Sequence, residues 1–250
     1  MKNTMIASAV ALASVSALQA SLVVVGSLQT EQGNPADWDP MNSTLVMTEA
    51  SGVYTYTATG LSDGVLYEFK VLDNEGTLPT VWGDPEIVPV NTALWGDATG
   101  SSLITVNTNL TNNNGNAVVW ITSNNAPLQA VGNFMVAAGG AADWVPQDPT
   151  FNMTPQGAGY FTLDTTISTP GTYEFKANDG TGATGWEHQV GPDGISNNAG
   201  TISFTTTSNN QPVTLFVDLT NQSIGAIVPE PSSAALLGLG GLALILRRRQ

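Results

Sequence analysis

The sequence contains no cysteine among its 250 residues, which excludes disulfide bonds, thiol catalysis and cysteine-based metal sites. Stability must then come from hydrophobic cores. Histidine is nearly as scarce, because His188 is the only one. With no second histidine and no serine or cysteine motif beside it, His188 is expected to be a solvent-facing loop residue. We therefore predict a protein that is not an enzyme, with no cofactor and no metal site.

Cations are also rare, with 6 lysines and arginines against 20 acidic residues. Four of the six lie near the two ends of the chain, so only Lys70 and Lys176 remain between them. The part between the ends has a formal charge of 2 − 20 = −18. Nucleic acid binding is excluded, since no basic cluster exists that would displace phosphate counterions. An acidic, polar surface suits a soluble protein outside the cell.

The first twenty residues have the order of a secretory signal peptide. Lys2 supplies a cation, a small and apolar run extends from Met5 to Leu18, and Ala20 is a small residue at the expected cleavage point. We predict a signal segment over residues 1–20 that is removed by signal peptidase. A short core strand or a membrane anchor is the alternative interpretation.

The C-terminus carries a second targeting pattern. Pro229, Glu230 and Pro231 precede an apolar run over residues 234–246, and Arg247, Arg248 and Arg249 follow it. Thirteen helical residues extend for ~20 Å, less than the ~30 Å hydrocarbon core. The segment 229–250 resembles the PEP-CTERM sorting signal. The resemblance implies recognition by an exosortase, a transient anchor through a short transmembrane helix, and export to the cell envelope or extracellular matrix of a Gram-negative bacterium. An ordinary tail anchor is the alternative.

An internal repeat organises the rest of the chain. The run Tyr67-Glu68-Phe69-Lys70 returns as Tyr173-Glu174-Phe175-Lys176, and the same offset of 106 relates Trp38 to Trp144. On a strand, the aromatic residues of this run would face a core and the charged residues would face outward. The sequence therefore predicts two copies of one domain, over residues 21–123 and 128–228.

Short apolar or alternating runs separated by turn residues predict an all-β fold of two tandem antiparallel β-sandwiches. The expected strands cover 21–28, 43–48, 53–59, 66–72, 103–106 and 117–122 in the first copy, and 130–134, 151–154, 160–165, 172–177, 201–206 and 213–218 in the second. Pairing Trp120 with Phe216 suggests that the first copy has about ten extra residues, within 80–102.

Each copy also has a tryptophan in a loop, a lysine on a strand and another tryptophan beyond it. Aromatic rings stack on the apolar faces of sugars, and a lysine donates hydrogen bonds to hydroxyl groups. This chemistry favours a neutral polysaccharide as the partner. The alternatives are that Trp38 and Trp144 plug the ends of the sandwiches and that Lys70 and Lys176 pair with nearby carboxylates. Met47, Met153 and Trp120 are expected in the core.

The second copy resembles known carbohydrate-binding modules over Val131-Gly132-Asn133-Phe134, the run from Ala142 to Pro146, Gly171 to Lys176, and Trp186. It is similar to the sandwich modules attached to bacterial pullulanases, to SusE-like outer-membrane starch-binding modules and to glycogen-binding modules of the immunoglobulin-like early-set type. The resemblance implies α-glucan contacts by Trp144, Lys176, Trp186 and Asn198, and by Trp38, Lys70 and Trp82 in the first copy.

The leading hypothesis is thus a secreted, non-catalytic protein that binds α-glucan or another neutral polysaccharide. The main alternative is a structural or glycosylated exopolysaccharide-matrix protein without sugar binding. A glycoside hydrolase or its accessory protein is a distant third.

Overall fold

The computed structural model describes residues 21–74, 86–96, 101–122, 126–180 and 184–230. Within these ranges the regular structure is antiparallel β-sheet, with two short 3-10 turns, η1 (Val136–Ala138) and η2 (Pro149–Phe151). The all-β prediction is confirmed. The expected signal helix and C-terminal transmembrane helix lie outside the described residues, as do Trp82 and Arg247 to Arg249. Among the described residues no helix is long and apolar enough to span a bilayer.

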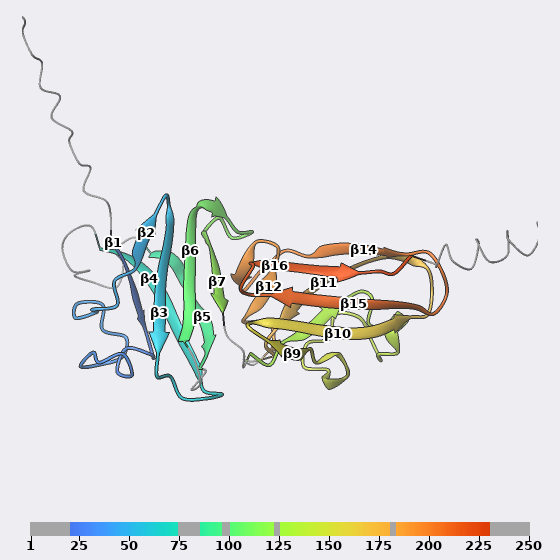
Figure 1. Cartoon of the computed structure of the whole chain (residues 1–250), viewed down its shortest axis with the longest axis horizontal. Coiled ribbons are helices and arrows are strands. Elements are labelled where there is room, and N and C mark those ends of the chain that lie inside the picture. The colour runs from blue at the N-terminus through green and yellow to red at the C-terminus, as the bar shows by residue number, and fades with distance from the viewer. Residues whose placement is uncertain (1–20, 75–85, 97–100, 123–125, 181–183, 231–250) are drawn as a thin grey trace, which may run out of the picture.

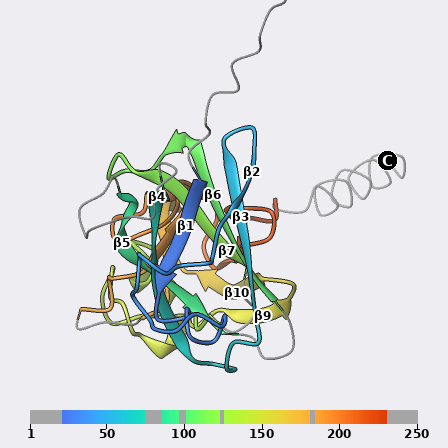
Figure 2. The same ribbon diagram turned by 90° about the vertical axis from the view of Figure 1, so that its left-hand side faces the viewer.

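The first half of the chain forms two sheets (Figures 1 and 2). One has the strand order β1-β4-β5, from β1 (Ser21–Gly26), β4 (Leu66–Asn74) and β5 (Glu86–Trp95). The other has the order β2-β3-β6-β7, from β2 (Thr48–Ala50), β3 (Val53–Thr59), β6 (Ser101–Thr111) and β7 (Ala117–Thr122).

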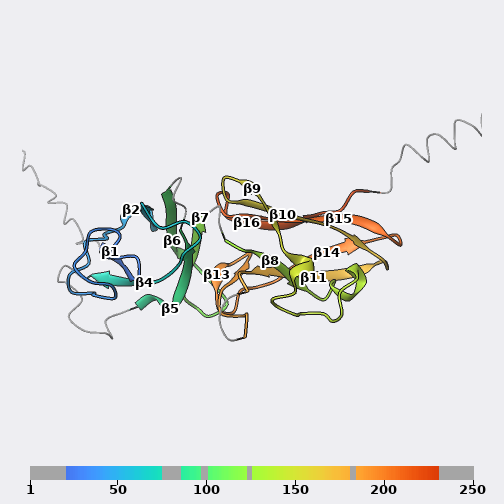
Figure 3. The same ribbon diagram turned by 90° about the horizontal axis from the view of Figure 1, so that it is seen from below.

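The second half also has two sheets, which face each other as layers (Figure 3). One has the order β13-β12-β11-β14, with β8 paired to β11, from β8 (Gln129–Gly132), β11 (Gly171–Asn178), β12 (Gln189–Gly191), β13 (Gly194–Ser196) and β14 (Ile202–Thr206). The other has the order β16-β15-β10-β9, from β9 (Thr154–Gly157), β10 (Tyr160–Ile167), β15 (Gln211–Asp218) and β16 (Ser223–Ile227).

The repeated Tyr-Glu-Phe-Lys run lies on β4 and on β11, as its alternation predicts. Tyr67 and Phe69 are buried on β4, and Tyr173 and Phe175 are buried on β11. Burying one such aromatic side chain stabilises a fold by about 1.5–3 kcal/mol. The glutamates and lysines of both runs point away from the core. The expectation of one apolar and one polar face is therefore confirmed.

The predicted equivalence between Trp120 and Phe216 is wrong. Trp120 lies on β7 opposite Thr105, whereas Phe216 lies on β15 opposite Thr162. In the first half β7 pairs with β6, and in the second half β16, which the sequence did not predict, pairs with β15. The predicted burial of Trp120 is confirmed, because its side chain is 4% exposed.

The length difference between the halves is also not within 80–102. Tyr54 of β3 lies opposite Val106, and its equivalent Tyr160 lies opposite Asp218. Val106 of β6 is paired with Val119 of β7, so residues 107–118 lie between the two paired positions. In the second half Asp218 of β15 is paired with Ser223 of β16, and only residues 219–222 lie between them. The extra residues of the first half therefore form the longer β6–β7 hairpin.

One contiguous cluster of buried side chains extends through both halves, and it includes Leu22, Phe69, Met47, Met153 and Phe175. The joint lies where β13 packs beside β5 and β7, the edge strands of the two first-half sheets (Figure 3). A covered edge is protected from pairing with other chains. The two halves therefore share an apolar joint, and the predicted core positions of both methionines are confirmed.

Candidate functional site

The loop that follows the first strand has the same construction in both halves. Trp38 has a φ of 55° and Trp144 a φ of 57°, in the left-handed region that bulky residues rarely adopt. The backbone N–H of Trp38 donates to the carbonyl of Gly26 at 3.2 Å, and that of Trp144 donates to Gly132 at 3.1 Å. The same strained backbone conformation, with the same hydrogen bond, thus occurs once in each half, at positions 106 residues apart.

The aspartate before each tryptophan closes the same loop. Asp37 Oδ1 accepts the N–H of Thr30, and Asp143 Oδ1 accepts the N–H of Val136, both at 2.8 Å. These carboxylates stabilise backbone turns. Among the described residues no group of three or more acidic, histidine or cysteine side chains is placed to hold a metal ion.

Gly26 and Gly132 fix where these loops begin. A Cβ on either glycine would lie 2.1 Å from a carbonyl oxygen, that of Glu68 or that of Glu174. Such contact is far inside van der Waals distance, so only glycine allows the two backbones to approach. The loop that carries each tryptophan is thereby locked against the strand that carries each lysine.

Both loop tryptophans are half-buried. Trp38 packs on Val23, Val25 and Leu72, which form a small cluster separate from the main core. Trp144 packs against the main cluster. Each indole thus covers buried side chains on one face and is in contact with solvent on the other. Its position fits both a plug at the end of the sandwich and a contact for a ligand.

Lys176 and Trp186 lie together in the second half. Lys176 Nζ is 5.5 Å from the centroid of the Trp186 ring, within the range of a cation–π interaction. The ammonium group donates to Gln189 Oε1 at 2.6 Å and to the carbonyl of Ala199 at 2.9 Å. Burial lowers the pKa of Lys176, and the negative charge of Asp193 partly opposes this shift. The predicted alternative, a lysine paired with Glu174 or another nearby carboxylate, does not describe these two bonds, because their acceptors are an amide oxygen and a backbone carbonyl.

Gln189 organises the surroundings of this pair, although no sequence pattern indicated a role for it. Its Nε2 atom donates to the carbonyls of Trp186 and Asn197, both at 2.7 Å. Its side chain is buried, and β12 holds it beside β11. The loop residue Asn198 is exposed, with its Nδ2 atom 3.4 Å from Asn114 Oδ1 of the first half. The second-half residues Lys176, Trp186 and Asn198 are therefore tied into one network.

The first half shows less of its predicted site. Lys70 is half-buried on β4, on the same face as Leu72, one of the residues that Trp38 covers. Trp82 lies outside the described residues, so its relation to Lys70 stays a prediction.

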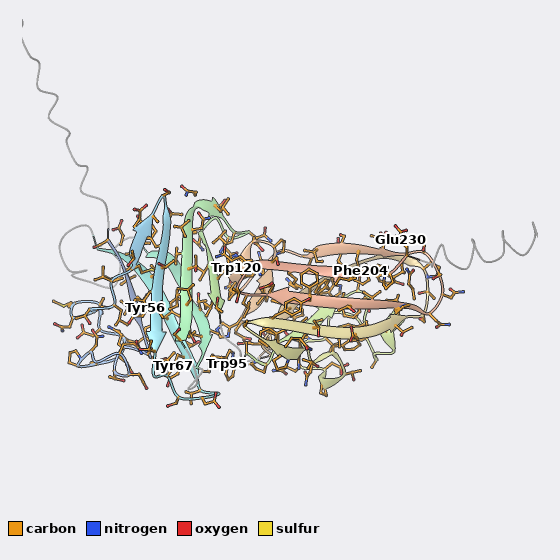
Figure 4. The ribbon with its side chains drawn as sticks, viewed as in Figure 1. Tyr56, Tyr67, Trp95, Trp120, Phe204 and Glu230 are labelled. Atoms are coloured by element: carbon orange, nitrogen blue, oxygen red, sulfur yellow. The ribbon has the colours of Figure 1, made fainter. Side chains whose placement is uncertain are left out.

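The expectation for His188 is wrong, because this residue is only 6% exposed. Its Nδ1 atom lies 3.1 Å from Asp179 Oδ2, and its Nε2 atom lies 3.8 Å from Glu68 Oε1 of the first half. Trp95 of the first half donates its indole N–H to the same Asp179 oxygen at 3.3 Å. Figure 4 shows Trp95 at the end of β5 that faces the second half. His188 is therefore a residue of the joint.

A cavity of about 30 Å³ lies beside this histidine, lined by residues from both halves that include Trp95, Ile121, Val190 and Leu219. A volume of this size holds about one or two water molecules. It is too small for a sugar ring, so the polysaccharide hypothesis rests on the outer surface around Lys176.

These features define a class, an antiparallel β-sandwich protein. Comparison with family models supports the class for the first half, because residues 21–77 match the pullulanase X25 domain, a non-catalytic accessory module. Residues 228–249 match the PEP-CTERM protein-sorting motif, which indicates export and sorting by an exosortase. No curated protein matches the chain. The X25 match covers only β1 to β4 of the first half, and no second module is matched.

Proposed function

We propose that residues 21–123 and 128–228 are tandem immunoglobulin-like sandwich modules of the early-set type that bind α-glucan or another neutral polysaccharide outside the cell. The X25 match to the first half supports this proposal. The second half has the same glycine, aspartate and tryptophan geometry in the loop after its first strand.

The contact between Lys176 and Trp186 carries the proposal. The partly exposed indole offers a flat apolar face for a sugar ring, and the ammonium beside it is a hydrogen-bond donor for hydroxyl groups. The strongly acidic chain repels anionic polymers, which favours a neutral polysaccharide. Trp144 and Asn198 complete the proposed second-half site, and Trp38, Lys70 and Trp82 form the proposed first-half site.

The terminal segments give this function its location. We propose that signal peptidase removes residues 1–20 and that an exosortase cleaves near Pro229, Glu230 and Pro231 after a transient anchoring of the C-terminal helix in the membrane. The match to the sorting motif supports this sequence of events. The product would reside in the cell envelope or extracellular matrix of a Gram-negative bacterium.

Affinity gel electrophoresis of the exported protein in amylopectin, pullulan and cellulose tests the proposal. We expect retardation in the two α-glucan gels. Trp186→Ala should abolish it while leaving the hydrogen bonds of the Lys176 ammonium in place. Glu174→Gln, on the exposed surface of the same strand, is the matched control and should migrate as the parent does. Absence of retardation in every gel, or equal retardation of Trp186→Ala, would refute sugar binding as stated.

A structural or glycosylated matrix protein is the second candidate function. It is favoured by the use of Lys176 inside the fold, where two of its hydrogen bonds hold Gln189 and the carbonyl of Ala199. A lysine that acts only as this clamp would affect stability and not binding. Release of soluble sugars from the polymers would instead support a hydrolase.

A further inference from the structure

The β6–β7 hairpin is where the first half is longer than the second, and its tip reaches the second half. The backbone N–H of Asn113 donates to Asp193 Oδ2 at 2.9 Å. The carboxamide of Asn114 donates to Asn197 Oδ1 at 2.7 Å and accepts from Asn198 Nδ2 at 3.4 Å. The extra residues of the first half thus end in direct contacts with the turn before β13 and with the loop after it.

The side chains of this contact lie at the surface. Asn114, Asn197 and Asn198 are all exposed, so solvent reaches the carboxamides even though they bond to one another. Hydrogen bonds between exposed amides add little to stability, because water satisfies the same groups. We call these three residues the asparagine cluster. Its hydrogen-bonding capacity is available to a ligand that displaces water.

The asparagine cluster adjoins the proposed sugar-binding pair. The carbonyl oxygens of Trp186 and Asn197 both lie 2.7 Å from Gln189 Nε2, so they are at most 2.7 + 2.7 = 5.4 Å apart. Lys176 donates to the carbonyl of Ala199, which directly follows Asn198. The segment between Trp186 and the cluster is therefore held by partly buried hydrogen bonds within the second half, in addition to the contact with Asn114.

We propose that the asparagine cluster is a second subsite of the Lys176–Trp186 site, assembled from both halves, which binds further units of the same polysaccharide chain. This inference rests on the proposed function. A carboxamide both donates and accepts hydrogen bonds, and it therefore matches sugar hydroxyls in either direction without requiring a charged ligand. A chain whose first ring stacks on Trp186 reaches Asn114 within a few sugar units. The longer hairpin thus makes the second-half site selective for longer chains.

Calorimetric titration of the exported protein with maltose and maltoheptaose tests this subsite. The parent protein should bind maltoheptaose more tightly than maltose. Asn114→Ala should weaken maltoheptaose binding about fivefold, the loss of one or two net hydrogen bonds, and leave maltose binding unchanged. Asn197→Ala, which removes the oxygen that accepts from Asn114, should do the same from the other side of the joint. Asn109→Ala is the matched control, because Asn109 is an exposed amide of the same hairpin whose Nδ2 atom donates within the first half, to Ser51.

The outcomes separate the two proposals. If the parent binds neither sugar, the proposed function fails. If the parent binds and Trp186→Ala abolishes binding, but Asn114→Ala and Asn197→Ala both keep the parent affinity for maltoheptaose, the composite subsite is refuted. An equal loss for maltose and maltoheptaose also refutes it, since a displaced loop would weaken the whole site. Thermal unfolding of each variant identifies any loss that comes from unfolding.

Discussion

The carboxylate of Glu68 lies 3.8 Å from Nε2 of His188, so a strand of the first half meets a loop of the second half at the only histidine in the chain. The side chains of His188 and Asp179 are 7% and 4% exposed, and Trp95 of the first half donates to Asp179. Buried polar groups are costly when a partner is lost. The joint therefore depends on polar contacts from both halves as well as on the shared apolar cluster.

A double-mutant cycle between Glu68→Gln and His188→Gln should show coupling across the joint. The two side chains are close and the imidazole is buried, so we expect a coupling free energy of about 0.5–1.5 kcal/mol in urea unfolding of the whole chain. Glu174→Gln, the same substitution at the equivalent exposed position of β11, should change stability by less than about 0.5 kcal/mol. Additive effects of the first pair would show that Glu68 and His188 do not interact.

Much of the fold could be predicted because the repeat is ungapped where strands β1 to β4 correspond to β8 to β11. The alternation in Tyr67 to Lys70 also fixed which face is buried. Strands β5, β12, β13 and β16 were missed. The last three are short and each contains a glycine, so they lack an alternating signal. Trp120 was matched to Phe216 because both are aromatic. The strand pairing shows that the two residues are not equivalent, since β7 pairs with β6 whereas β15 pairs with β10.

The site could be predicted only in part. Lys176 and Trp186 were expected together and lie together. Gln189 and Asn114 were not expected, because amide side chains follow no periodic pattern and Asn114 belongs to the other half. His188 was expected in solvent, since its burial comes from residues such as Glu68 and Trp95 that are distant in sequence. Contacts across the joint have no local sequence signal.

Gly132→Ala should lower the free energy of unfolding by about 3 kcal/mol. Gly26→Ala should lower it by a similar amount. The added Cβ would lie 2.1 Å from a backbone carbonyl oxygen in either half, and overpacking against backbone cannot relax by a change of rotamer. Gly171→Ala is the control, since its Cβ would lie 3.3 Å from the ring of Tyr173. Urea unfolding measures the three variants. A Gly132→Ala variant as stable as Gly171→Ala would contradict the close approach of the loop to β11.

The contribution of Lys176 to the free energy of unfolding should change with pH in the alkaline range. Burial lowers its pKa below the usual 10.5, so the folded protein binds this proton less tightly than the unfolded chain does. The charged lysine therefore costs stability below its folded pKa, and the cost disappears as the pH rises from that value towards 10.5.

The unfolding free energy of the parent minus that of Lys176→Met should consequently increase with pH over this window. Tyr56 gives the opposite slope, because burial raises its pKa, but it does so in both proteins and cancels in the difference. Urea unfolding at a series of pH values up to 10.5 measures the difference. A difference that stays flat or decreases would show that Lys176 is not desolvated.

Glycine should be tolerated better than alanine at Trp144. Both substitutions remove the indole, so the difference between them reports the backbone alone. At the φ of 57° an L-residue is disfavoured by roughly 1–2 kcal/mol relative to glycine, and we expect Trp144→Gly to be the more stable variant by about 1 kcal/mol. The same two substitutions at Trp120, on strand β7, should show the usual order, with the alanine variant more stable by about 0.5–1 kcal/mol.

Equal stability of the two Trp144 variants in urea unfolding would mean that the backbone at this position adapts to its residue. The predicted reversal would mean instead that the loop, fixed by Gly132 and Asp143, holds the tryptophan in a conformation that its own backbone disfavours.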